Sequence, residues 1–297
     1  MSWAVVARKD FEDAVRSKML WAITVLFVVF TAGGMFAVDL AFDDMQAFDA
    51  LMWLSAPASL IVPITALIAA YLSIAGERES GSIKLLLGLP HTRRDVLVGK
   101  LLGRTGVVAV ATFVAFAAGA VVLLVQYGSL PVVAFSLLGL LTFFFALTFV
   151  GIAVGISAMT ATRARAMASA IGVFFIFELL WDVVPTGVYY LVEGTVPNPA
   201  VQKLPAWYFF VQRLTPSNAY GAATTLAVNP DTARSLTVGA GGQTQASSQA
   251  SNGLADFVVG GEIPFYLEDW FGLVVLAVWL VVPLALGYWN FRQADLS

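Results

Sequence analysis

The sequence of 297 residues has no cysteine and only one histidine, His91. The absence of cysteine excludes disulfides, cysteine-based zinc clusters and thiol catalysis. A single histidine also excludes the metal motifs that need two, so no metal site is expected. Charged residues are scarce as well: they make up 12% of the chain, whereas 59% is hydrophobic and the mean hydropathy is +0.84. This composition lies far outside the range of soluble domains, so the chain is an integral membrane protein.

Long apolar runs account for most of the chain. A helix needs about 20 apolar residues to cross the roughly 30 Å of hydrocarbon in a bilayer, and six runs are close to that length or longer. Pro57 and Pro63 are expected to bend the second run, which a helix bundle tolerates where neighbours repair the lost hydrogen bonds. The sequence therefore predicts an all-α, polytopic protein with six transmembrane helices. These helices are residues 19–38, 52–75, 101–125, 132–159, 166–184 and 270–289.

The basic residues are sorted between the two sides of the membrane. If the N-terminus is cytoplasmic, every Lys and Arg belongs to an inner segment except Lys203, Arg213 and Arg234. These three lie in a long outer insertion, residues 185–269, which the positive-inside rule does not weigh because long loops cross regardless of charge. The pattern predicts a multi-pass protein of the cell membrane with both termini in the cytoplasm.

Residues 1–18 precede the first apolar run and have an amphipathic pattern. Trp3 and Phe11 share one helical face, and charged residues occupy the other. Arg8 and Glu12 are spaced i,i+4, which favours a helix in water or at the lipid headgroups. We interpret this segment as an interfacial amphipathic helix. The alternative is an ordinary solvated helix that leads into the first span.

A charged inner segment, residues 76–95, separates the second and third runs. It begins with carboxylates and an arginine, continues with small residues, and then forms an apolar ridge that Pro90 ends. A short helix lying along the inner membrane surface would bury that ridge. Thr92 and Asp95 form a capping-box pattern, so a new helix should begin at Arg93 and continue into the third span. The alternative is a loop that merely connects two helices.

The outer insertion is the one part of the sequence that could hold a small external domain. Four consecutive aromatic residues at 207–210 are typical of the membrane surface. Residues 234–253 are rich in Gly, Ser and Gln, which predicts a mobile loop, with ligand binding as an alternative. Between these segments, Pro216 is expected to begin an outer helix capped by Ser217 or Asn218.

Two carboxylates lie inside the fifth run. Glu178 and Asp182 are spaced i,i+4, so a regular helix would place them on one face near its outer end. A carboxylate within a membrane span is costly and is a functional candidate by default. The pair is therefore a possible contact for a substrate or an ion.

Glycines recur at small-xxx-small spacing in two of the runs. Such spacing lets two helices approach closely. The contact could lie between two copies of the chain or within one copy, and packing within one copy is the preferred interpretation. The pairs are Gly99 with Gly103 and Gly151 with Gly155.

The inner segment and the start of the third run carry a set of residues that belong together: Glu79-Ser80-Gly81-Ser82-Ile83, Leu86-Leu87, Pro90, Arg93 and Gly99-Lys100. This set resembles the inner-loop signature of permease subunits of type-2 ABC exporters. The resemblance is to the branch that includes the membrane subunit of the nitrous oxide reductase maturation transporter. It extends to the amphipathic N-terminal helix, the six spans and the long insertion, and so covers nearly the whole chain.

The resemblance implies how the protein would be driven. In that family the inner loop forms a coupling helix that docks into a cleft on a separate ATP-binding subunit. The working unit resembles two permeases on two ATPases, so a second permease copy or close paralogue is an expected partner. The positions that the resemblance assigns to docking are Glu77, Arg78, Glu79, Gly81, Ser82 and Arg93.

No nucleotide-binding motif accompanies this segment. The sequence G-x-x-x-x-G-K-[ST] does not occur, and Gly99-Lys100 is followed by Leu101. We therefore expect a non-enzymatic subunit without a cofactor and without a nucleic-acid partner. The substrate is not evident. Copper is not carried over from the named relative, because the seven Met are scattered and copper would require clusters of Met, His or Cys.

The sequence thus predicts the permease subunit of an ABC transporter, and the resemblance favours an exporter. Two alternatives remain open. One is a membrane partner that uses the motion of an ATPase to act on an external protein through the outer insertion. The other is an ATP-independent secondary carrier that uses Glu178 and Asp182, although no inverted repeat of the kind common in such carriers is evident.

Overall fold

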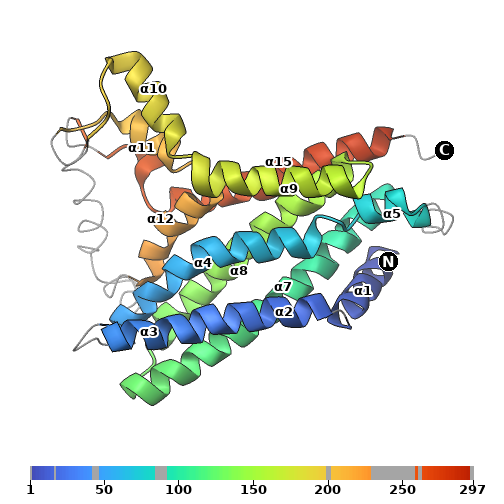
Figure 1. The fold of residues 1–297 in the computed structure, drawn as a ribbon, viewed down its shortest axis with the longest axis horizontal. Helices are drawn as coiled ribbons and strands as arrows, with labels where there is room; N and C mark the ends of the chain where they lie inside the picture. The colour runs from blue at the N-terminus through green and yellow to red at the C-terminus, as the bar shows by residue number, and fades with distance from the viewer. Residues whose placement is uncertain are drawn as a thin grey trace, which may run out of the picture.

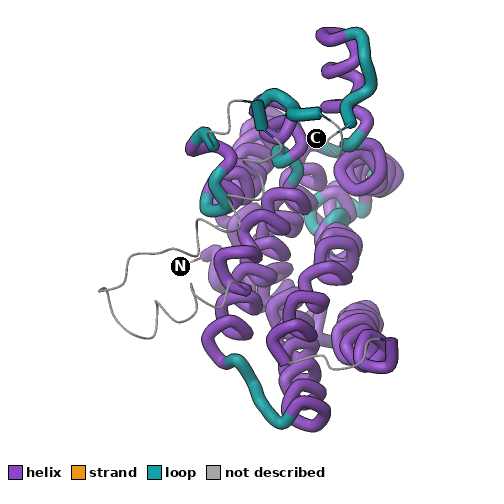
Figure 2. Tube along the Cα trace, turned by 90° about the vertical axis from the view of Figure 1, so that its left-hand side faces the viewer, coloured by secondary structure: helices purple, strands orange, loops and turns teal. Residues whose placement is uncertain are grey.

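The computed structural model describes residues 2–16, 18–41, 47–83, 92–198, 202–228, 258–259 and 263–294. Within these ranges the chain is built from helices joined by short connections (Figure 1, Figure 2). The two ends of the chain lie at the same end of an elongated bundle (Figure 1). The apolar ridge after Ile83, Pro90, His91 and the stretch 234–253 lie outside the described residues, and Ile83 itself is buried.

Four of the described helices are long and apolar enough to cross a membrane, and a bent pair could form a fifth span. The four are Ala58–Glu79, Arg93–Tyr127, Val132–Met159 and Phe271–Gln293, and the bent pair is Arg163–Leu180 with Val183–Glu193. The first predicted run appears as a shorter apolar helix, Trp21–Ala37. The all-helical membrane architecture is therefore confirmed, whereas the number six stays a prediction.

The N-terminal part contains α1 (Ser2–Val15), α2 (Lys18–Val28) and α3 (Gly34–Ala41). A π-helical turn, Val29–Gly33, joins α2 to α3, so the helix is continuous from Lys18 to Ala41. The next helix, α4 (Ala47–Ala70), leads through a turn into the short α5 (Ala75–Glu79). The predicted second span, 52–75, thus ends about a turn later than the long helix does.

Helix α7 (Arg93–Tyr127) begins where the capping-box pattern predicts. The backbone N–H of Asp95 donates to the hydroxyl of Thr92 at 3.1 Å, and the Thr92 N–H donates back to the Asp95 carboxylate at 3.0 Å. Reciprocal bonds of this kind satisfy N–H groups that have no partner within the helix. Gly128, with φ of 64°, ends the helix in the left-handed conformation that glycine adopts without strain. The third span therefore belongs to one unbroken helix, as predicted.

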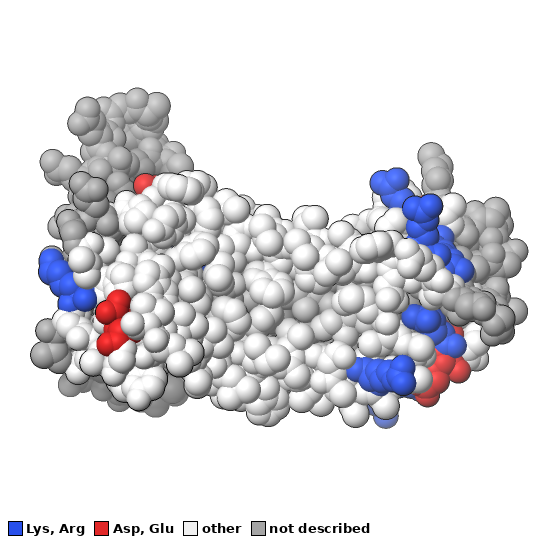
Figure 3. Space-filling model, turned by 90° about the horizontal axis from the view of Figure 1, so that it is seen from above, with Lys and Arg blue, Asp and Glu red and all other residues white. Residues whose placement is uncertain are grey.

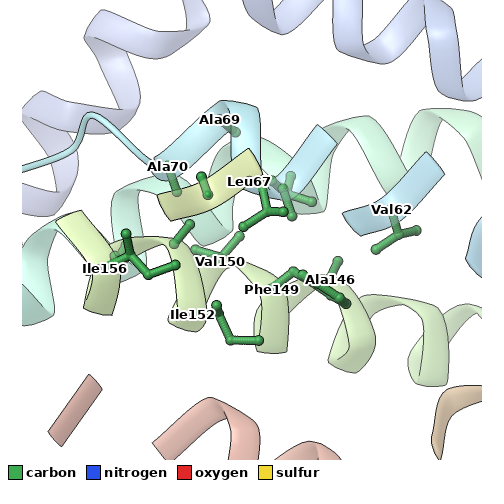
Figure 4. Close-up of a cluster of buried hydrophobic side chains, with 14 of the residues drawn as sticks. Val62, Leu67, Ala69, Ala70, Ala146, Phe149, Val150, Ile152 and Ile156 are labelled. Carbon is green, nitrogen blue, oxygen red and sulfur yellow. The ribbon is translucent and has the colours of Figure 1, made fainter. Parts of the chain in front are cut away.

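Helix α8 (Val132–Met159) has the bounds predicted for the fourth span and lies in the centre of the bundle. Its side chains interdigitate with those of α4 (Figure 4), where Leu67 and Val62 face Phe149 and Ala146. On another side it packs against α15 (Phe271–Gln293). A Cβ on Gly155 would lie 2.4 Å from the carbonyl oxygen of Pro283, so glycine is required for this close approach.

Both glycine pairs of the sequence therefore serve contacts within one chain. Gly151 and Gly155 face α15, and Gly99 and Gly103 face α1. This agrees with the preferred interpretation of packing within one copy.

The predicted fifth span, 166–184, is not one straight helix. Helix α9 (Arg163–Phe175) continues as a π-helical turn, Ile176–Leu180, and α10 (Val183–Glu193) then leaves at an angle of 56°. A π-turn changes the angular spacing of side chains and is a recognised cause of helix bending. Part of the segment assigned to the outer insertion is therefore a continuation of the helix.

The insertion also contributes to the bundle core. It contains α11 (Ala206–Gln212) and α12 (Pro216–Val228), and α12 packs against α8 and α15. Tyr220 of α12 is buried, stacks on Phe145 with ring centroids 4.4 Å apart, and shares a 2.8 Å hydrogen bond with Thr142. Part of the predicted outer insertion therefore packs within the helix bundle, while the side of the membrane on which the insertion lies stays a prediction.

The predicted start of α12 is correct, but the predicted cap is not. Pro216 is the first helical residue. The N–H of Asn218 donates to the hydroxyl of Thr215 at 3.2 Å, so the residue before the proline provides the cap. This is the ordinary arrangement, because proline is favoured at the first helical position. Ser217 instead donates its hydroxyl hydrogen bond to Glu178.

The aromatic cluster predicted at the membrane surface packs mainly on itself and on neighbouring loops. Tyr208 and Phe209 of α11 are buried beside Tyr189 of α10. Leu204 and Val258 form an isolated backbone bridge beneath them. The short 3-10 helix Phe265–Leu267 completes this small cluster before α15 begins.

Candidate functional site at the charged end of the bundle

Figure 3 shows more lysine and arginine side chains at one end of the molecule than at the other, where a smaller basic group lies beside acidic residues, and a wide uncharged surface separates the two ends. The more basic end contains α1, α5, the start of α7 and the C-terminal end of α15 (Figure 1). An uncharged middle with charged ends is the pattern expected of a protein that spans a bilayer. The charged inner segment thus lies at the end where basic residues concentrate.

Helix α5 is attached to the end of α8 by buried polar contacts. The backbone N–H groups of Ile74 and Ala75 donate to the hydroxyl of Ser157, at 3.0 and 2.9 Å. Ser157 is fully buried, so its hydroxyl serves N–H groups that water does not reach. Arg78 adds a second link, since its guanidinium donates to the carbonyl oxygen of Thr160 at 2.9 Å. The start of the inner segment is therefore fixed to the central helix of the bundle.

Glu77 takes part in a buried cluster of four charges. Its carboxylate lies 2.5 Å from the ammonium of Lys100, and the same ammonium lies 2.8 Å from the carboxylate of Asp10. Arg104 completes the cluster, with its Nε 2.8 Å from the other oxygen of Asp10. The Asp10 side chain is only 3% exposed and that of Lys100 only 9%. Two positive and two negative groups balance, which buried charges require.

We define Asp10, Glu77, Lys100 and Arg104 as the inner ionic cluster. It joins three elements that are far apart in the sequence: α1, α5 and α7. Apart from Glu77, its members were not predicted as site residues. A signal was present, because Asp10 lies i,i+4 from Val6 and Ala14, both of which are buried. A carboxylate within an apolar helical stripe needs a buried partner.

Glycines of α7 provide the surface on which α1 packs. A Cβ on Gly99 would lie 2.6 Å from the Cβ of Val6, and one on Gly103 would lie 2.8 Å from the carboxylate of Asp10. On the outer face of α1, Arg8 donates to Glu12 at 2.7 Å, and this hydrogen bond holds the pKa of the Glu12 carboxyl below its ordinary value. The face of α1 that packs on α7 carries Val6, Asp10 and Ala14, whereas Trp3 is 45% exposed, and the interfacial position of this helix stays a prediction.

The residues after α5 form an exposed edge. Glu79, Ser80 and Ser82 are exposed, and the hydroxyls of the two serines lie 2.9 Å apart. Gly81 has φ of +76°, a conformation that strains any residue with a Cβ. The Glu79 carboxylate accepts a hydrogen bond from the backbone N–H of Arg163 at the start of α9. We call residues 79–82 the exposed edge of the inner segment.

Arg93 contacts the C-terminal end of α15 within the same chain. Its guanidinium donates to the carbonyl oxygens of Phe291, Arg292 and Ala294, the latter two at 3.0 and 2.9 Å, and lies over the Phe291 ring. The last carbonyls of a helix have no partner within it, and a basic side chain is a common donor to them. Arg93 therefore fastens the end of α15 to the start of α7.

The six predicted docking residues thus separate into two groups. Glu77, Arg78 and Arg93 make contacts within the chain that hold the inner segment in place. The other three belong to the exposed edge and are available to a partner at this end. They are Glu79, Gly81 and Ser82.

The predicted carboxylate pair is divided in the same way. Glu178 lies in the π-helical turn, is half-buried and accepts a hydrogen bond from Ser217 at the start of α12. Asp182 is exposed at the bend before α10. The two carboxylates thus differ in exposure, and their role as a contact for a substrate or an ion stays a prediction. The hydrogen bond from Ser217 places Glu178 beside the N-terminal end of α12.

These observations describe a multi-pass helical membrane protein that has a braced, charged segment at one end. Comparison with known proteins gives the same class in more detail. A family model described as "ABC-2 family transporter protein" matches residues 4–296. The chain belongs to this family of ABC transporter permeases, whose members work with an ABC ATPase.

Two curated relatives carry the printed name "Probable ABC transporter permease protein NosY". The protein of Pseudomonas aeruginosa is 31% identical over 200 residues, which cover 64% of this chain and 71% of the relative. The protein of Stutzerimonas stutzeri is 32% identical over 198 residues, with the same two coverages. The chain is therefore the membrane subunit of an ABC transporter, as the resemblance predicted.

Proposed function

We propose that this chain is the permease subunit of an ABC exporter and that a separate ATPase drives it by docking on the inner segment, residues 76–95. The observation that carries the proposal is the combination of an exposed edge with a braced base. Residues 79–82 are open at the surface, whereas Ser157, Arg78 and the inner ionic cluster attach the same segment to α7 and α8.

Such an arrangement suits the transmission of force. A segment that moved independently of the bundle would absorb the motion of a partner, whereas one fixed by buried bonds transfers it. In the mechanism we propose, closure of the ATPase pair moves the two coupling segments. The spans on either side of each segment, α4 and α7, carry the motion, and the interface between two permease copies opens outward.

The working unit that we propose contains two permeases and two ATPase subunits, with six spans in each permease. Both termini lie in the cytoplasm, and the unit belongs to the plasma membrane. The concentration of basic residues at the end that holds both ends of the chain supports this orientation. Glu178 and Asp182 stay the proposed contact for a substrate or an ion, with Glu178 in the outer half of the bent span.

The test is co-purification of the tagged chain with the ATPase encoded beside it. Glu79→Lys reverses a charge on the exposed edge and should abolish the complex. Because Glu79 also accepts a bond from Arg163, a second variant, Ser82→Arg, adds bulk at the edge and leaves that bond intact. Glu193→Lys is the matched control, since Glu193 is exposed at the end of α10. Retention of the ATPase by both edge variants would contradict the docking site.

A further inference from the structure

Asp10 is the least exposed member of the inner ionic cluster and lies on α1, outside the inner segment. Its two oxygens contact Lys100 at 2.8 Å and Arg104 at 2.8 Å. Lys100 in turn contacts Glu77 at 2.5 Å. Asp10 is therefore separated from the docking segment by a single side chain.

The contacts continue from Glu77 to the exposed edge. The carbonyl oxygen of Glu77 accepts hydrogen bonds from the hydroxyls of Ser80 and Ser82, at 3.3 and 3.5 Å. The position of Glu77 thus influences the shape of the edge that follows it. A continuous set of polar contacts leads from the buried face of α1 to the surface at which the ATPase is proposed to dock.

We propose that Asp10 is a positioning residue for ATPase docking: by holding Lys100 it fixes Glu77 and, through Glu77, the exposed edge. This inference rests on the proposed function of the inner segment. It makes the N-terminal helix part of the coupling apparatus and more than a membrane anchor.

The packing of α1 indicates that the inner ionic cluster orients Glu77 and is not needed to hold α1 against α7. Close contact with the glycines of α7 already holds α1 in place, since Gly99, Gly103 and Gly106 all meet its residues. Buried ion pairs contribute little net stability compared with well-packed apolar side chains. What the charges add is orientation, because they connect α1 and α7 to Glu77 of α5.

Removal of Asp10 alone should disturb Glu77. In Asp10→Asn, the cluster would keep the two cations, Lys100 and Arg104, but only one carboxylate, that of Glu77. The Lys100 ammonium would lose its second anchor and could move with Glu77. Asp10→Asn should therefore weaken ATPase docking although the Asp10 side chain is only 3% exposed.

The experiment is a double-mutant cycle on the affinity of the purified ATPase for the purified full-length permease in detergent. Asp10→Asn and Glu77→Gln should each weaken binding by about tenfold, the middle of the range for residues that share a network. The double variant should bind no more weakly than either single variant. Glu12→Gln is the matched control, because it removes a carboxylate from the exposed face of the same helix and should leave affinity unchanged.

A second variant separates positioning from charge imbalance and from misfolding. Asp10→Asn combined with Arg104→Gln leaves Lys100 and Glu77 as a neutral pair. We expect this variant to elute as a folded protein and still to bind the ATPase about tenfold more weakly. Wild-type affinity in this variant, or additive losses in the cycle, would overturn the role of Asp10. Failure of the wild-type chain to bind any ATPase would instead refute the proposed function.

Discussion

The contact between α8 and α15 gives the sharpest prediction for stability. In Gly155→Ala the new Cβ would lie 2.4 Å from the carbonyl oxygen of Pro283 and 2.6 Å from its carbonyl carbon. Real Cβ atoms essentially never come closer than 3.0 Å to a heavy atom. The opposing atoms are backbone, so no side chain can turn away. The two helices would have to separate by several tenths of an ångström.

Two effects of the substitution oppose each other. Replacing glycine by alanine in a helix favours the helix by about 1 kcal/mol. Overpacking a closely packed contact costs about 1–3 kcal/mol. We expect the upper part of that range, because Gly287 of α15 packs against the backbone of Gly155 and prevents a local adjustment. The free energy of unfolding should therefore fall by about 2 kcal/mol, because the cost of overpacking exceeds the gain in helix propensity.

Thermal unfolding of the purified protein in detergent, followed by tryptophan fluorescence, measures this difference. A loss of about 2 kcal/mol should lower the apparent Tm by roughly 4–8 °C. The matched control is Gly172→Ala in α9, where a Cβ meets nothing within 4 Å. The control should unfold at the wild-type temperature or slightly above it. Equal Tm values for the two variants would refute the close α8–α15 contact.

Three further substitutions test separate parts of the structure. Ser157→Ala would leave the N–H groups of Ile74 and Ala75 without their acceptor and should destabilise the protein by about 1–3 kcal/mol; an unchanged Tm would contradict the attachment of α5. Gly81→Ala should cost about 1–2 kcal/mol of backbone strain at φ +76°, although a Cβ there meets no neighbour; it should weaken ATPase retention in pull-downs and lower the Tm by roughly 2–8 °C, and wild-type values for both would contradict the strained turn. Tyr220→Phe removes a buried hydrogen bond and should lower stability by about 1 kcal/mol, and a neutral result would show that α12 does not depend on it.

Much of the fold could be predicted from composition and local pattern. The fourth span has the bounds that its apolar run indicates, and the start of α7 follows from Thr92 and Asp95 alone. These features depend on short-range physics, namely hydropathy over a window and a cap that spans four residues. The family model confirms the family resemblance. The resemblance could be found from the sequence because the residues that carry it lie close together in the chain.

The features that the sequence did not reveal depend on contacts between distant segments. Hydropathy gave no sign that α12 enters the bundle, since its packing depends on the shapes of α8 and α15. The π-turn at Glu178 and the 56° bend after it leave no clear local pattern in the sequence. The partners of Glu77 and Arg93 lie 23 and 198 residues away, respectively. A charged residue of the inner-segment motif can therefore contact the rest of its own chain, and the motif alone does not show this.

The most direct test of the central claim is site-specific cross-linking in native membranes. Because the chain has no cysteine, a single introduced cysteine is the one position on this chain that a thiol-reactive, photoactivatable cross-linker can label. Ser82→Cys on the exposed edge is compared with Val192→Cys, whose side chain is 65% exposed on α10. The account predicts a covalent product with the ATPase subunit from position 82 and none from position 192. A product from position 192 alone, or from neither position when the complex is present, would contradict docking at the inner segment.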